Sequence, residues 1–200
     1  KMGETPSAEI SAAWERGCNF LQAFSTSPDD LPGIGDSDDG YALSPFLRLA
    51  WEHQTTLPAC RSFEETGYTL IQDRSLQLQV IVDHGPLGKP PNYAHGHADA
   101  LSLSMRIGDK EVLVDSGTYT YTGEVTWRSY FRDTRAHNTV MVDGEGQARQ
   151  ETPFSWSSPY TCKLVHREFK NGGAQLLARH DGYSKSCGVI HWRGVAYLPP

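Results

Sequence analysis

Two runs of alternating apolar and polar residues constrain the fold of this chain more than any other feature of its sequence. They span residues 68–73 and 76–83, where apolar side chains recur at every second position. A period of two is that of a β-strand with one buried face, and 19 glycines and 12 prolines supply turns between strands. Further strands are predicted over residues 101–107, 111–115, 138–143, 160–166, 174–180 and 188–197. The pattern therefore predicts a mainly β fold of antiparallel strands.

The N-terminal part of the chain has a helical pattern instead. Apolar side chains recur there at the spacing of one helix face, at Ile10, Trp14, Cys18 and Leu21. They predict a helix over residues 6–24 with Thr5 as its N-terminal cap, and a second short helix is predicted over residues 44–53. Helices followed by strands predict two regions, residues 1–54 and residues 55–200. The last residues read as a strand that stops abruptly, so we expect the β region to be truncated.

Charge and hydropathy exclude two classes of partner. The chain has 24 acidic and 18 basic residues and a net charge of −6, whereas a nucleic-acid binder needs a basic face. Mean hydropathy is −0.50, and no run approaches the roughly 18 apolar residues of a membrane span. No export signal is visible at the start of the sequence. The four cysteines form no CxxC pair, which leaves both free thiols and two disulfides open.

The most unusual stretch of the sequence covers residues 92–99. It holds His95, His97 and Asp99 at alternate positions, so that in an extended chain the three side chains would share one face. Imidazoles on one face can hold a metal ion or form a pair of general acid–base groups. The alternative is a polar strand end with surface histidines.

His137 and Asp115 add to this pattern, because each lies at the end of a predicted strand. Two histidines and one aspartate form a ligand set suited to zinc, with room for a fourth ligand. In a straight hairpin, however, the residues facing Asp115 lie roughly 17–20 Å from His97 at about 3.3 Å per residue. The chain around Gly96 must therefore curl back for such a site to form.

Several motifs follow one another in a specific order. They are His95–Ser102, Leu113–Tyr121, Trp127–Thr134 and Ala136–Val140. In order and spacing they resemble the heparinase II/III-like polysaccharide lyases over residues 63–155, and residues 34–40 resemble the linker of that family. The resemblance implies an N-terminal α/α toroid, a C-terminal antiparallel β-sandwich and an active site in the cleft between them.

On this resemblance, residues 1–54 are the end of the toroid and residues 55–200 most of the β-sandwich. It implies a single structural zinc ion held by His97, Asp115 and His137, and it places His95 in the catalytic cleft. Asp99 and Asn138 are expected to orient the histidines from outside the ligand set. A periplasmic or secreted location also follows from the resemblance alone.

The implied reaction is β-elimination at a uronic acid of an acidic polysaccharide. His95 and Tyr121 are candidates for its proton transfers, and Arg128 and Arg132 could clamp the substrate carboxylate, although packing and surface ion pairs are the alternatives. Core packing is predicted for Trp127 and Trp156, with sugar stacking as the alternative. The main catalytic tyrosine of the family, together with an asparagine or histidine, belongs to the toroid, most of which we expect to lie outside these 200 residues. A non-catalytic β-sandwich module for glycan binding or scaffolding is therefore the second hypothesis.

Overall fold

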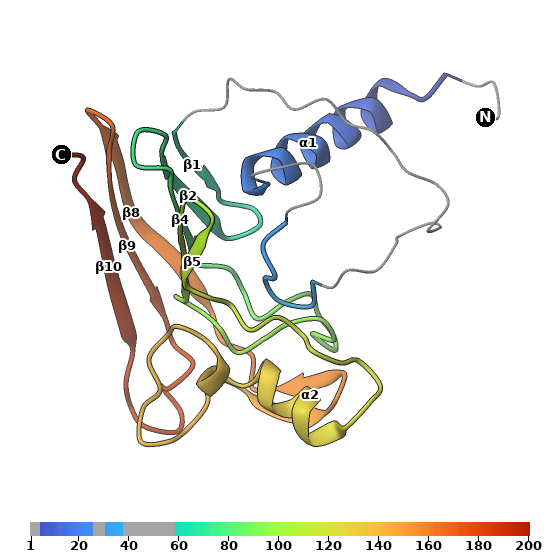
Figure 1. Cartoon of the computed structure of the whole chain (residues 1–200). Coiled ribbons are helices and arrows are strands. Elements are labelled where there is room, and N and C mark those ends of the chain that lie inside the picture. The colour runs from blue at the N-terminus through green and yellow to red at the C-terminus, as the bar shows by residue number, and fades with distance from the viewer. Residues whose placement is uncertain (1–4, 26–30, 38–58) are drawn as a thin grey trace. The chain divides into compact units, whose positions relative to one another are not determined.

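The computed structural model describes residues 5–25, 31–37 and 59–200 (Figure 1). These residues fall into two compact units, one with residues 5–25 and 31–32 and the other with residues 33–37 and 59–200. The helix predicted at residues 44–53 lies outside the described residues, as does the predicted boundary between residues 54 and 55.

The first unit contains one described helix, α1 (Ala8–Phe24). It begins two residues later than predicted, because the cap is Ser7 and not Thr5: the Ser7 side chain accepts a hydrogen bond from the Ile10 amide at 3.3 Å. Neither α1 nor any other described helix has the length and apolar character needed to cross a membrane.

The second unit is built from antiparallel sheets, which confirms the predicted mainly β fold. Its largest sheet has the order β1-β2-β3-β4-β5 and contains β1 (Cys60–Phe63), β2 (Tyr68–Asp73), β3 (Leu78–Asp83), β4 (Leu103–Ile107) and β5 (Lys110–Leu113). A second sheet has the order β10-β9-β8 and contains β8 (Cys162–Lys170), β9 (Gly173–His180) and β10 (His191–Tyr197). A short hairpin joins β6 (Arg149–Thr152) and β7 (Ser155–Ser157).

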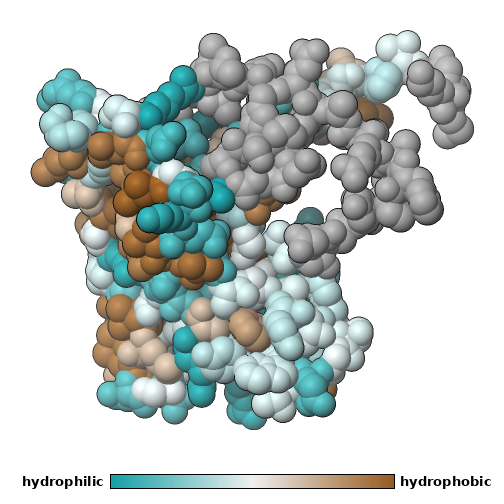
Figure 2. Space-filling view, viewed as in Figure 1, coloured by the Kyte–Doolittle hydropathy of each residue, from teal (hydrophilic) through white to brown (hydrophobic). Residues whose placement is uncertain are grey.

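The two larger sheets pack together through a hydrophobic core. Ile71 and Val82 of the first sheet lie in one buried cluster with Ala174 and Leu176 of the second. Burial of these side chains on facing sheets makes the unit a β-sandwich. The three-stranded sheet also leaves hydrophobic side chains such as Trp192 exposed, and Figure 2 shows hydrophobic residues gathered on its side of the molecule.

Two segments differ from the predicted elements. The strand predicted at residues 138–143 is wrong: the segment makes only an isolated bridge between Val142 and Glu145. Residues 125–136, for which no element is predicted, form helix α2 (Val125–Arg132) and a 3-10 turn, η1 (Thr134–Ala136). The buried residues of α2 are both arginines, whereas its aromatic residues Trp127 and Tyr130 are exposed, which reverses the usual arrangement of an amphipathic helix.

The chain between β3 and β4 curls back at Gly96, as a site at His97 requires. A Cβ atom on Gly96 would lie 1.6 Å from the Leu87 carbonyl oxygen, so only glycine fits there. The Gly96 carbonyl in turn accepts hydrogen bonds from the Trp156 indole at 2.9 Å and from Arg132 Nε at 3.2 Å. Leu87, which is part of this loop, and Trp156 belong to a second buried hydrophobic cluster. The loop therefore packs on a small core of its own.

Gly96→Ala is expected to lower the free energy of unfolding by about 1–3 kcal/mol, the usual cost of forcing extra atoms into a packed site. Thermal and urea denaturation followed by circular dichroism would measure it. Gly194→Ala in β10 is the matched control, because its Cβ would meet nothing closer than 3.9 Å. Equal stability of the two variants would contradict the close packing at Gly96.

Candidate functional site

Three buried side chains form the centre of the candidate site. His97, Asp99 and His137 each offer a ligand atom, and these atoms all lie within 4.8 Å of one another. His97 and Asp99 come from the loop after β3, and His137 follows η1. Segments far apart in the sequence therefore meet at one point, where His97 and His137, two of the predicted metal ligands, lie close together.

The nitrogen atoms of this centre fit a metal ion. His97 Nδ1 and both ring nitrogens of His137 are buried without a hydrogen-bond partner, an arrangement that normally costs about 1–3 kcal/mol per group. Asp115 Oδ2 lies 3.3 Å from His137 Nδ1 but without hydrogen-bonding geometry. A bound cation would use one ring-nitrogen lone pair from each neutral histidine. Asp99 was predicted only to orient the histidines from outside the ligand set. Both Asp99 and Asp115 lie close enough to His137 to share a metal ion with it.

Burial disfavours the charged form of the carboxyl groups in and beside the centre. Burial raises the pKa of Asp83 well above its ordinary value, and the neighbouring Asp99 raises it further. Burial also raises the pKa of Asp99, against the opposing effect of His137 and His97. The charge of Asp83 raises the pKa of Tyr68. Such mutual repulsion is relieved by a cation.

Asp36 is a site residue that sequence reasoning missed. Its Oδ2 lies 3.0 Å from His95 Nδ1, and its Oδ1 lies 2.9 Å from His97 Nε2. Arg128 binds both oxygens of the same carboxylate, with Nη2 at 2.8 Å from Oδ2. The signal available in the sequence is the linker-like segment at residues 34–40, which does not by itself assign a role to this aspartate.

The hydrogen-bond donors around the Asp36 side chain keep its carboxylate ionised. Burial alone would raise its pKa, but hydrogen bonds from His97, Arg128 and Thr118 outweigh burial and hold the pKa far below its ordinary value. The Thr118 hydroxyl donates at 2.7 Å. The carboxylate is therefore ionised and serves as an acceptor for all its neighbours.

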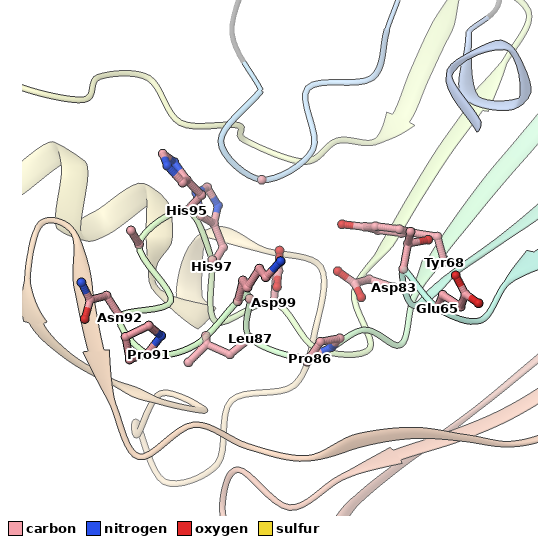
Figure 3. Close-up of a pocket in the computed structure, with 16 residues that line it drawn as sticks. Glu65, Tyr68, Asp83, Pro86, Leu87, Pro91, Asn92, His95, His97 and Asp99 are labelled. Carbon is pink, nitrogen blue, oxygen red and sulfur yellow. The ribbon is translucent and has the colours of Figure 1, made fainter. Parts of the chain in front are cut away.

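A cavity of about 380 Å³ lies beside this centre (Figure 3). Its lining includes His95, His97, Asp99, Tyr68 and Asp83. Figure 3 shows the His95 and His97 side chains next to each other. The His95 side chain is 75% exposed, whereas that of His97 is fully buried. His95 is thus the histidine available to a ligand.

The other predicted site residues are held by the protein itself. Arg128 and Arg132 are buried, and Arg132 donates to the carbonyls of Gly96 and Pro153. The Tyr121 hydroxyl donates to the Asp36 carbonyl, and the Asn138 amide donates to the carbonyls of Leu103 and Val114 at 2.9 and 2.8 Å. These contacts give each residue a structural role, while substrate contact by Arg128 and Arg132 and a catalytic role of Tyr121 stay predictions.

The two tryptophans differ in their surroundings. Trp156 is buried and lies under Arg132, whose Cζ is 4.7 Å from the ring centroid. Trp127 is 49% exposed, so the prediction of core packing is wrong for it. It belongs to an aromatic cluster in which Tyr119, Trp127 and Tyr130 are exposed and Phe131 is half-buried.

Comparison with known protein families shows to which family this chain belongs. The sequence model described as "Heparinase II/III-like, C-terminal" matches residues 55–199. The chain belongs to the heparinase II/III-like C-terminal domain family. A search of curated proteins gives no match.

Solved structures share the fold of this heparinase II/III-like chain. The heparinase III BT4657 gene product superposes with a TM-score of 0.71 at 20% identity, covering 95% of this chain and 31% of that one. The heparan sulfate lyase HepC from Pedobacter heparinus gives 0.69 at 16%, covering 96% and 31%, and a structure described as heparinase III gives 0.67 at 15%, covering 96% and 33%. The chain thus spans about a third of the length of these structures.

Arg128→Met is expected to destabilise the heparinase II/III-like unit by about 3–5 kcal/mol, because it removes one partner of a buried ion pair. Urea denaturation would measure the change. Arg135→Met is the control, since Arg135 pairs with Asp133 at the surface and its loss should cost less than about 1 kcal/mol. Similar losses for both variants would contradict a special role of the Arg128–Asp36 pair.

Proposed function

We propose that this chain supplies the β-sandwich side of a polysaccharide lyase active site that cleaves a uronic-acid-containing glycan by β-elimination. The observation that carries the proposal is an exposed histidine, His95, held at the edge of a cavity beside a buried cluster of histidines and carboxylates. Membership of the heparinase II/III-like family supports the reaction class. An N-terminal toroid is the partner that would complete the cleft.

The proposed reaction needs groups that move protons. A base removes the proton from C5 of the uronic acid, and the electron pair of that C–H bond forms a C4–C5 double bond. The C4–O bond then breaks, and the leaving glycosidic oxygen takes a proton. A neutral imidazole can accept the first proton, and His95 is the exposed imidazole at this cavity.

We further propose that the buried centre holds one zinc ion. His97 and His137 would bind it through their unpartnered ring nitrogens, with Asp115 and Asp99 as the available carboxylates. When bound, the ion would cross-link the loop after β3 to the segment after η1 and offset the buried negative charge. A structural role fits the burial of all its candidate ligands.

The lyase proposal is tested with the chain and with the full product of its gene, each incubated with a panel of uronic-acid polysaccharides. Ultraviolet absorbance of the unsaturated product is expected with at least one glycan. His95→Ala should lower the rate by about 10²–10⁴-fold, the usual contribution of a proton-transfer group. Absence of product from the full gene product across the panel would overturn the proposal.

The zinc proposal is tested by elemental analysis of the purified chain and by titration of the metal-free chain. One zinc per chain is expected, and its removal should lower the melting temperature. His137→Ala should weaken zinc binding by at least about 10–100-fold, whereas His166→Ala, at an exposed position of β8, should not. Zinc binding that survives His137→Ala unchanged would contradict this site.

A non-catalytic glycan-binding module is the second candidate. The exposed aromatic cluster around Trp127 favours it, because exposed aromatic faces provide contact area for a ligand. Glycan binding that depends on Trp127, without unsaturated product even from the full gene product, would favour this function over the lyase.

A further inference from the structure

The Asp36 carboxylate lies between the exposed histidine of the cavity and a buried histidine of the proposed metal centre. One oxygen faces His95 Nδ1 at 3.0 Å and the other faces His97 Nε2 at 2.9 Å. Arg128 pairs with both oxygens of this carboxylate, as an ionised aspartate allows. Because an ionised carboxylate only accepts hydrogen bonds, each ring nitrogen that faces it must carry a hydrogen. One side chain therefore assigns the proton positions of two histidines.

The consequences for the two rings are opposite. His95 carries its hydrogen on Nδ1, so in the neutral ring the lone pair is on Nε2, the nitrogen not engaged by Asp36. His97 carries its hydrogen on Nε2, so its lone pair is on Nδ1, which is buried and unpartnered. A carboxylate that orients a metal-binding histidine in this way is a common arrangement. Here the same carboxylate also orients the histidine of the cavity.

The position of Asp36 is determined by other side chains. Arg128 binds both of its oxygens, Thr118 donates to Oδ1, and the Tyr121 hydroxyl donates to its backbone carbonyl. Only 6% of the Asp36 side chain is exposed. The exposed His95 ring, by contrast, has this carboxylate as its anchor, so the orientation of the ring depends on it.

We propose that Asp36 is a positioning residue that holds His95 in the tautomer with a free Nε2 and ties it to His97 of the proposed metal centre. The catalytic consequence rests on the proposed lyase function. The tautomer itself does not, because it is a property of the protein without substrate. The two ideas can therefore fail separately.

The tautomer is measured by nitrogen-15 NMR of histidine-labelled protein, at a pH where free histidines are neutral. The His95 signals are assigned by their loss in His95→Gln. We expect a hydrogen on Nδ1 and none on Nε2 in the native chain. A hydrogen on Nε2, or rapid averaging between the two nitrogens, would overturn the proposal without any Asp36 variant.

The Asp36→Asn variant provides a second test of the tautomer proposal. Oδ1 accepts from three side chains and Oδ2 from two, so the amide group is expected at the Oδ2 position, facing His95 Nδ1. As a donor it would favour the opposite His95 tautomer. Asp73→Asn is the control, because Asp73 accepts from Ser75 and Leu76 in a turn and should leave the His95 signals unchanged. An unchanged tautomer in folded Asp36→Asn would overturn the proposal, and if that variant does not fold, the native spectrum decides.

In the full gene product, Asp36→Asn should also lower kcat by about 100-fold with little change in KM, because a misoriented proton-transfer group affects the chemical step. An unchanged kcat would refute the positioning role in catalysis. The native spectrum could show the expected tautomer while the full gene product turns over no glycan. That result would refute the lyase proposal and leave the tautomer assignment standing.

Discussion

The buried guanidinium of Arg128 is the constraint on which the rest of the site depends. A guanidinium with 1% exposure is costly to bury without strong acceptors, and Asp36 supplies a carboxylate for it from a segment 92 residues earlier in the chain. Once Asp36 is placed there, the positions of His95 and His97 follow from its two oxygens. The ion pair thus links helix α2, the loop after β3 and the segment at residues 33–37.

Arg132, which lies a single helical turn after Arg128, has a similar role. It binds backbone carbonyls of the loop after β3 and of the turn between β6 and β7, and it stacks on Trp156. Burial and the neighbouring Arg128 lower its pKa to about 10, so it stays charged at neutral pH. Two arginines at a four-residue spacing on α2 therefore organise loops that lack regular secondary structure of their own.

The sequence predicted those regions of the molecule in which local pattern and tertiary environment agree. Strands formed where they were predicted at β2, β3 and β9, with β3 beginning two residues later than expected, and β2 buries three consecutive residues rather than a single face. The segment at residues 138–143 has similar apolar content, but Asn138 and Thr139 use their side chains to bind distant carbonyls, and no ladder forms. Helix α2 escaped prediction because charged residues occupy its buried positions.

The site was partly predictable for the same reason. Paired histidines at alternate positions indicate a ligand set, and the structure brings His97 and His137 together. No local pattern, however, indicates that Asp36 meets His95 and Arg128 across gaps of 59 and 92 residues. The choice between Asp99 and Asp115 likewise depends on a chain reversal at Gly96, which periodicity cannot describe.

The place of Asp36 in the chain has a consequence for modular evolution. The family match begins at residue 55, yet the carboxylate that pairs with the buried Arg128 comes from residue 36. A recombination event that exchanged everything before residue 55 would replace this aspartate along with its neighbours. If relatives exchange the part of the chain before residue 55, the site therefore stays intact only where the new segment also carries a carboxylate at the position of Asp36.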